Sequence, residues 1–277
     1  MKAKTIKSVL GTAFLLVMIL VASSFNNSDA TTNNLTVLSE EQPTFHRTAI
    51  VKGVEIFYRE AGTRDKPTIL LLHGYPTSSH MFRNLITDLS VQYHVLAPDY
   101  PGYGRSEQPS MKDFEYSFDN MATMVEGFLD ELHINKYSIY LMDYGAPIGF
   151  RIAAKYPERV ESLIIQNGNA YEEGLRDFWI PIKKYWNDHT IENGKALEGF
   201  HSPDGLKWQY THGVQDSTKI SPDNWNLDLQ HLTRTENDKI QLAMFYSYRT
   251  NVPLYPKWQQ YFRDHQPPTL IVWGKND

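Results

Sequence analysis

The sequence YSIYLMDYGAPIGFRIAAKYP at residues 137–157 decides the fold. It begins as an apolar run rich in Tyr, Ile and Leu, a composition typical of a buried β-strand. The run breaks at Asp143, and Gly145 follows two positions later. From there Ile148 and Ile152 recur at the spacing of one helix face. Residues 137–157 therefore predict a strand, a sharp turn and a helix.

Asp143 is expected at the tip of this turn, where the helix begins. A carboxylate there is stabilised by the helix dipole and by free backbone N–H groups, so we expect it to be ionised at neutral pH. An ionised carboxylate can attack an electrophile without a separate base. The simpler alternative is that Asp143 only caps the helix, because Asp is a preferred capping residue. Motifs elsewhere in the chain favour the nucleophile.

The first residues predict an exported protein. Residues 1–24 have three lysines, an apolar run and then small residues, the pattern of a cleaved secretory signal peptide. Cleavage after Ser24 or after Ala30 fits this pattern, and an uncleaved membrane anchor is the alternative. Residues 25–42 are rich in Asn, Thr and Ser and predict a flexible leader. We expect the mature protein to be secreted or periplasmic, without stable membrane association.

Composition narrows the class of protein further. The chain has 277 residues, and 41 % of them are hydrophobic, which is sufficient for one large α/β domain. The net charge of −5 becomes more negative once the lysine-rich signal is removed, so nucleic acid is a poor candidate partner. There is no Cys to form a disulfide. No His, Asp or Glu cluster has metal-ligand spacing, so no metal or other cofactor is expected.

The rest of the chain predicts a parallel sheet. Residues 49–60 alternate as strands do around a Lys-Gly turn, which indicates an antiparallel hairpin at one edge of a sheet. Short apolar runs are typical of central parallel strands, and apolar residues at helical spacing lie between them. The runs are at 68–72, 93–98 and 160–165, and the helical patterns are at 81–89 and 119–132. This alternation predicts right-handed crossovers.

The pattern changes between residues 171 and 265. This stretch is rich in Trp and Tyr, breaks into short helical pieces and has no run typical of a buried strand. It is too long for a loop and predicts an inserted helical cap. A strand pattern returns at residues 269–273. We therefore expect a first core part over 43–170, a cap over 171–265 and a second core part over 266–277.

Four motifs in this order resemble one known branch of proteins. They are His73-Gly74-Tyr75-Pro76, the loop DYPGYGRS at 99–106, the turn at Asp143, and WGKND at 273–277. Together they resemble the epoxide hydrolase and haloalkane dehalogenase branch of the α/β-hydrolase superfamily. The resemblance implies an α/β-hydrolase fold, with a mostly parallel sheet, helices on both faces and an inserted helical cap. A further C-terminal strand and helix are expected in that fold but not found before residue 277.

The resemblance also implies a mechanism. The Asp143 carboxylate would form an alkyl-enzyme ester, which water then cleaves. The backbone N–H groups of Tyr75 and Tyr144 correspond to the oxyanion hole. Asp277 corresponds to the acid that orients a histidine base, and that base is expected beyond the end of this sequence; without it this fragment would not complete the reaction. His73 is expected to make structural hydrogen bonds.

Two activities fit these residues. Epoxide hydrolysis to a diol needs phenols in the cap, and the resemblance points to Tyr248, with Tyr246 as the fallback, and to Tyr185. Haloalkane dehalogenases usually have Trp beside the nucleophile and Asn after the His-Gly pair, where this chain has Tyr144 and Tyr75. Epoxide hydrolysis is therefore the first expectation and dehalogenation the second, with a non-catalytic ligand-binding scaffold third. The aromatic cap predicts a small, mostly apolar substrate.

Overall fold

The computed structural model describes residues 42–276, which belong to the compact unit that begins at Ser39. The predicted signal peptide, nearly all of the predicted leader, and Asp277 lie outside the described residues. Within the described range, no helix combines the length and the apolar character needed to cross a bilayer.

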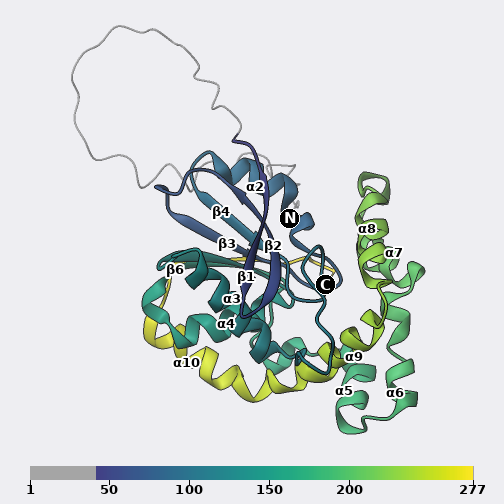
Figure 1. Ribbon diagram of the computed structural model, residues 1–277. Helices are drawn as coiled ribbons and strands as arrows, with labels where there is room; N and C mark the ends of the chain where they lie inside the picture. The colour runs from purple at the N-terminus through teal and green to yellow at the C-terminus, as the bar shows by residue number, and fades with distance from the viewer. Residues whose placement is uncertain (1–41, 277) are drawn as a thin grey trace, which may run out of the picture. The chain divides into compact units, whose positions relative to one another are not determined.

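A seven-stranded sheet forms the centre of the fold, in the order β1-β2-β4-β3-β5-β6-β7 (Figure 1). The strands are β1 (Phe45–Val51), β2 (Val54–Ala61), β3 (Thr68–Leu72), β4 (His94–Pro98), β5 (Tyr137–Met142), β6 (Val160–Gln166) and β7 (Thr269–Val272). Strand β2 pairs antiparallel with β1 and β4, and all other neighbours are parallel. The prediction of a mostly parallel sheet with an antiparallel hairpin at its edge is confirmed.

Local sequence explains the hairpin and the opposite edge. Lys52 and Gly53 join β1 to β2, and both have positive φ angles, of 50° and 85°. A two-residue hairpin turn favours this left-handed backbone because it matches the twist of the strands. At the other edge, all four residues of β7 are exposed, although Leu270 and Ile271 are apolar.

Helices cover both faces of the sheet, as predicted. On one face Leu70, Leu72 and Leu96 pack into the core that includes α3 (Phe118–Glu131) and α4 (Gly145–Lys155). Side chains alternate between the faces of a strand, so their sequence neighbours point the other way. Those neighbours are Ile69, Leu71, Val95 and Ala97, which pack with Phe82 and with Ile86 of α2 (Arg83–Ser90). Figure 1 shows α2 on the opposite side of the sheet from α3 and α4.

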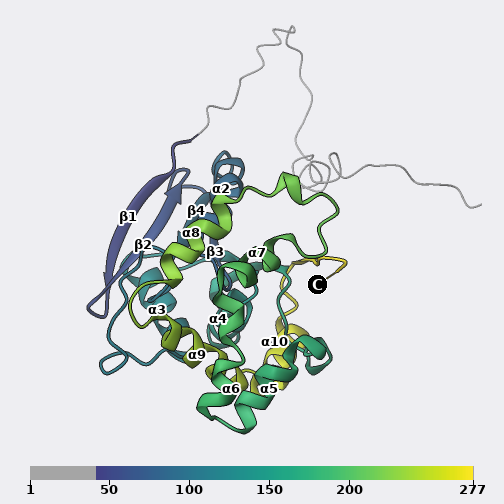
Figure 2. The same cartoon turned by 90° about the vertical axis from the view of Figure 1, so that its right-hand side faces the viewer.

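Six α-helices, together with short 3₁₀ helices, lie between β6 and β7, and none of residues 171–265 is in a strand. They are α5 (Ile180–Asn187), α6 (Ile191–Lys195), α7 (Pro203–Thr211), α8 (Asp223–Leu232), α9 (Asn237–Ser247) and α10 (Tyr255–His265). Helices α5 and α6 lie side by side, as do α7 and α8 (Figures 1 and 2). The last helix, α10, packs against α4, where Phe150 contacts Trp258 and Phe262. The exact boundaries of a cap domain stay a prediction.

A buried polar network joins α9 to the loop after β4. The hydroxyl of Tyr103 donates to Gln241 Oε1 at 2.8 Å, and Gln241 Nε2 donates to Asn237 Oδ1 at 2.9 Å. Asn237 Nδ2 in turn donates to the carbonyl of Gly102 at 2.8 Å. Because buried amides are costly unless they are paired, this network fixes how α9 sits over the loop.

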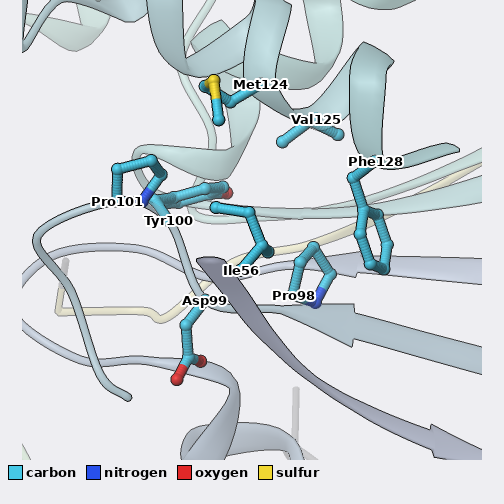
Figure 3. A pocket seen from close by; sticks show the side chains of 8 residues that line it. All are labelled: Ile56, Pro98, Asp99, Tyr100, Pro101, Met124, Val125 and Phe128. Atoms are coloured by element: carbon cyan, nitrogen blue, oxygen red, sulfur yellow. The ribbon is translucent and has the colours of Figure 1, made fainter. Parts of the chain in front are cut away.

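A small cavity of about 10 Å³ lies under the same loop (Figure 3). It is lined by Ile56, Pro98, Asp99, Tyr100, Pro101, Met124, Val125 and Phe128. Figure 3 shows the Asp99 carboxylate directed away from the other seven side chains. Its two oxygens accept hydrogen bonds from the backbone N–H groups of Ser79 and Arg105, at 2.7 and 2.8 Å. The cavity has room for about one water molecule at most, so it is a packing gap and not a substrate pocket.

Candidate active site

The topology of the sheet brings three loops together. Strands β3, β4 and β5 are parallel neighbours, so their carboxyl ends lie at one edge of the sheet. The loops that begin there start at His73, Asp99 and Asp143. Ligands bind at this edge in open α/β sheets. Three of the motifs identified in the sequence therefore lie at one place in the fold.

Asp143 occupies the sharp turn between β5 and α4. Its φ angle is 50°, which is uncommon for a residue other than glycine. The helix approaches the sheet very closely behind it: a Cβ atom on Gly145 would lie 2.3 Å from the carbonyl oxygen of Leu72. Only glycine fits at that position. The strained turn is therefore held by the packing of α4 on β3, and it places Asp143 at the carboxyl edge of the sheet.

One hydrogen bond joins the Asp143 carboxylate to the loop after β3. The backbone N–H of Tyr75 donates to Asp143 Oδ1 at 2.7 Å, a length typical of a charge-assisted bond. The two loops touch here, because a Cβ atom on Gly74 would lie 2.5 Å from Asp143 Cβ. A fixed backbone donor thus lies beside the carboxylate. The corresponding role of the Tyr144 N–H stays a prediction.

His73 has a structural part in the same loop. Its Nε2 accepts a hydrogen bond from the Tyr100 N–H at 3.2 Å, so Nδ1 carries the proton and donates to the Gly74 carbonyl at 3.0 Å. Burial lowers the pKa of His73, which agrees with a neutral ring. The hydroxyl of Tyr100 donates back to the His73 carbonyl at 3.0 Å. His73 therefore holds the loop in place, as the sequence predicts.

Aromatic side chains surround the carboxylate. Tyr144 packs against Phe118 of α3, with ring centres 4.9 Å apart, and Phe118 packs against Tyr248 at 5.3 Å. Tyr75 packs against Phe245 of α9 at 5.1 Å and against Tyr144 at 5.8 Å. These contacts, most of them edge-to-face, form a dense apolar wall. The wall places apolar surface beside the segments that hold the Asp143 carboxylate.

The tyrosines proposed from the cap separate into two groups. Tyr248 begins the 3₁₀ turn Tyr248–Thr250 and lies beside Tyr144, with ring centres 6.2 Å apart. Its hydroxyl is hydrogen-bonded to Tyr255, which accepts a further bond from Asn169 Nδ2 at 3.1 Å. Tyr185 is bonded through its hydroxyl to His189 Nε2 at 2.7 Å.

Tyr246, the fallback candidate, also belongs to the group around His189. Its ring stacks on His189 with centres 3.7 Å apart, and the Arg249 guanidinium lies 3.6 Å from its ring centre. Tyr185 contacts the same ring at 5.7 Å. The structure thus brings Tyr248 beside Tyr144, and it places Tyr185 and Tyr246 together in a separate cluster. Asp277 lies outside the described residues.

Asp228, in helix α8, is a buried acid that the motifs did not identify. Only 1 % of its surface is exposed, and one of its oxygens accepts a hydrogen bond from the Tyr210 hydroxyl. Burial raises its pKa to about 7. The sequence contained a sign of this acid, because Asp228 stands at helical spacing from the apolar residues Trp225 and Leu232. A carboxylate on such a face indicates an unusual environment.

The model of the α/β hydrolase fold family matches residues 67–277. An uncharacterized hydrolase of Saccharomyces cerevisiae, YNR064C, is 44 % identical over 237 residues, which cover 84 % of this chain and 81 % of the yeast protein. A haloalkane dehalogenase of Mycolicibacterium paratuberculosis is 39 % identical over 118 residues, 42 % of this chain and 39 % of that protein. Epoxide hydrolase 1 of Caenorhabditis elegans is 25 % identical over 248 residues, 82 % of this chain and 57 % of that protein.

Among solved structures, the haloalkane dehalogenase DbeA from Bradyrhizobium elkani superimposes with a TM-score of 0.67 at 21 % identity, covering 84 % of this chain and 81 % of DbeA. The chain belongs to the α/β hydrolase fold family. It is a hydrolase of that superfamily, with haloalkane dehalogenase and epoxide hydrolase relatives.

Proposed function

We propose that this hydrolase opens small, mostly apolar epoxides to diols by way of an ester on Asp143. The observation that carries the proposal is the position of the Asp143 carboxylate, held by the Tyr75 N–H at 2.7 Å within an aromatic wall. A carboxylate oriented in an apolar site is a competent nucleophile toward an sp³ carbon. No cofactor takes part in this chemistry.

In the first step a carboxylate oxygen of Asp143 attacks one epoxide carbon. The C–O bond of the ring breaks, an ester joins the substrate to the protein, and the opened oxygen needs a proton. Tyr248 and Tyr185 are the cap phenols proposed from the sequence for this proton transfer. The position of Tyr248 beside Tyr144 supports Tyr248 over Tyr185, whose hydroxyl is bonded to His189.

In the second step water attacks the carbonyl carbon of the ester. The negative charge then lies on a former carboxylate oxygen, and the N–H groups of Tyr75 and Tyr144 are proposed to stabilise it. One donor of this kind typically contributes about 3 kcal/mol to the transition state. Asp277 is proposed to orient the histidine that activates the water, and we assign no histidine of this sequence to that base.

Halide displacement from a haloalkane is the second candidate. The haloalkane dehalogenase relative supports it, and the first step is the same attack by Asp143 with a halide as the leaving group. The mature protein is proposed to be secreted or periplasmic, to act on a free small molecule, and to bind neither nucleic acid nor a membrane stably. These last proposals rest on the sequence alone.

The test is to incubate the purified chain with styrene oxide and, separately, with 1-bromobutane. We expect diol from the epoxide, or an intact-protein mass increased by one molecule of styrene oxide if the ester is stable. Bromide release without diol would favour the second candidate. The absence of product and of adduct with both substrates would contradict an Asp143 nucleophile and favour a ligand-binding scaffold.

A further inference from the structure

Arg151 is a nearly buried cation on α4, the helix that follows the Asp143 turn. Only 8 % of its side chain is exposed. Its Nε donates to Asp119 Oδ1 of α3 at 2.5 Å, and one terminal nitrogen donates to the carbonyl of Pro147, within α4, at 3.0 Å. A buried charge is costly unless it is paired, and a planar guanidinium can bond in several directions at once. These bonds therefore hold the charge in one place.

The same guanidinium holds the segment that contains Tyr248. The nitrogen that binds the Pro147 carbonyl also donates to Asn251 Oδ1 at 2.7 Å, and the other terminal nitrogen donates to Thr250 Oγ1 at 3.3 Å. Asn251 is fully buried, and its N–H donates to the carbonyl of Tyr248 at 2.9 Å. Arg151 thus joins the Tyr248–Thr250 turn to the helix that begins at the proposed nucleophile.

Two aromatic rings lie beside the guanidinium. Its central carbon is 5.9 Å from the ring centre of Phe118 and 5.5 Å from that of Trp258. Phe118 in turn packs against Tyr248 at 5.3 Å, and Trp258 packs against Tyr255 at 5.4 Å. One ring therefore connects Arg151 to each member of the hydroxyl pair formed by Tyr248 and Tyr255. A charge that acts through such packed protein is screened less than a charge in water.

The charge of Arg151 acts on both phenols of this pair. Burial raises the pKa of Tyr248 well above its usual value and nearby Tyr255 and Asp143 raise it further, whereas Arg151 lowers it. Burial also raises the pKa of Tyr255, and Arg151 again lowers it. Arginine stays protonated in proteins, so this effect is permanent. Arg151 favours the ionised form of a phenol that burial and Asp143 disfavour.

We propose that Arg151 is a positioning residue for epoxide opening, which holds Tyr248 in place and stabilises the phenolate that Tyr248 becomes. When Asp143 attacks, the ring C–O bond breaks, its electron pair moves to the oxygen, and that oxygen takes the Tyr248 proton. When water cleaves the ester, one of its protons goes to the diol and the other returns to Tyr248. The inference rests on the proposed epoxide hydrolysis and on Tyr248 as its acid.

Halide displacement makes a different demand on Arg151. A halide leaves as an anion and takes no proton, so Tyr248 stays neutral and there is no phenolate to stabilise. An effect of Arg151 that acts through Tyr248 should therefore be confined to epoxides. A general loss of structure would slow both reactions.

The experiment is a double-mutant cycle on the whole chain, with Arg151→Met, Tyr248→Phe and the variant that combines them. Met removes the charge and keeps an unbranched apolar stem. We expect Arg151→Met to slow single-turnover ester formation with styrene oxide about tenfold, because the phenolate loses a neighbouring positive charge. In the Tyr248→Phe background the same change should alter the rate by less than about twofold, because no phenolate forms there. Intact mass of the quenched protein measures the ester.

Arg159→Met is the matched control. Arg159 donates to Asp130 Oδ1 at 3.1 Å, and its guanidinium lies over two tyrosine rings, 5.6 and 5.5 Å from their centres. It has the same kinds of contact as Arg151 but follows the end of α4 that is opposite to Asp143. The control should lower the midpoint of thermal unfolding, as Arg151→Met does, and keep the rate of ester formation of the unchanged chain.

A second variant tests the charge without removing Arg151. The Asp119 side chain is 72 % exposed, and its carboxylate partly cancels the charge of Arg151. Asp119→Asn keeps a hydrogen-bond acceptor at the surface, so the fold should be kept. We expect ester formation to become about two- to threefold faster, and only while Tyr248 is present. A role of Arg151 limited to holding the fold predicts an unchanged or lower rate.

The outcomes separate the inference from the proposed function. Equal slowing by Arg151→Met with and without the Tyr248 hydroxyl would overturn the inference, and so would an unchanged rate in both backgrounds. If Arg151→Met does not fold, Asp119→Asn decides, and a rate no faster than that of the unchanged chain overturns the inference. Each of these results leaves the proposed function standing. If the unchanged chain forms no ester with styrene oxide, the proposed function itself is wrong, and the inference with it.

Discussion

The backbone N–H of Tyr75 donates a 2.7 Å hydrogen bond to the carboxylate of Asp143, although the two residues are 68 positions apart in the chain. The contact exists because β3 and β5 are parallel neighbours whose carboxyl ends meet at one edge of the sheet. It joins the two loops that contain the proposed nucleophile and one proposed oxyanion donor. The bond favours the ionised form of Asp143, since it is made to the charged group.

Asp143→Asn should abolish turnover. The amide has nearly the same shape, and Asn tolerates the positive φ angle at this turn, so the protein should still fold. It is a much weaker nucleophile, so neither ester nor diol should form. Product release is measured together with intact mass, which detects any hydrolysis of the new amide back to Asp. Full activity in a variant whose mass shows an intact Asn would rule out the mechanism.

Gly145→Ala should destabilise the fold. The new Cβ would lie 2.3 Å from the carbonyl oxygen of Leu72, so α4 must move away from β3. Overpacking of this kind costs about 1–3 kcal/mol or more. Gly199→Ala is the matched control, because its Cβ would have no atom within 4 Å. Urea unfolding of both variants checks the prediction, which fails if the two have equal midpoints.

Tyr248→Phe should slow epoxide opening and spare halide release, because only the epoxide oxygen needs a proton. The hydroxyl of Tyr248 is paired with Tyr255, so it must exchange that partner for the epoxide oxygen during the reaction. Rates of ester formation with styrene oxide and of bromide release are compared with those of Tyr137→Phe, which removes a buried unpaired hydroxyl from β5. An unchanged rate of epoxide opening would remove Tyr248 from the role of acid.

Asp228 should make stability depend on pH. Its pKa is raised to about 7 in the folded protein, mainly by burial, whereas in an unfolded chain an Asp titrates near 3.9. Between these values the folded state binds more protons than the unfolded state, so stability should decrease as the pH rises from about 4 through 7. Asp228→Asn replaces this titratable carboxyl group with an amide, so stability should depend less on pH in this range.

The check on Asp228 is thermal unfolding of both proteins between pH 5 and pH 8. We expect the midpoint of the unchanged chain to fall relative to that of Asp228→Asn as the pH rises. The amide can still accept the hydrogen bond from Tyr210, so the comparison isolates the charge. Parallel curves for the two proteins would show that Asp228 is not buried in its neutral form.

The cap shows where sequence reasoning reaches its limit. The helical nature of residues 171–265 was predictable, because the stretch breaks into short helical pieces, has no strand-like run and is too long for a loop. The partners of individual cap side chains were not. Tyr185 and Tyr248 are both tyrosines in aromatic surroundings, yet one hydroxyl is bonded to His189 and the other to Tyr255. Such pairings depend on which helices become neighbours, and no local pattern contains that information.

The sequence by itself determined the order of strands and helices, the turn at Asp143 and the need for Gly145 behind it. These features depend on apolar periodicity and on the space left by a missing side chain, which are local properties of the chain. Only the tertiary structure decided that Tyr75 reaches Asp143 and that Tyr248, rather than Tyr185, lies beside Tyr144. Hydrogen bonding between distant residues depends on how parallel strands and packed helices bring their loops together.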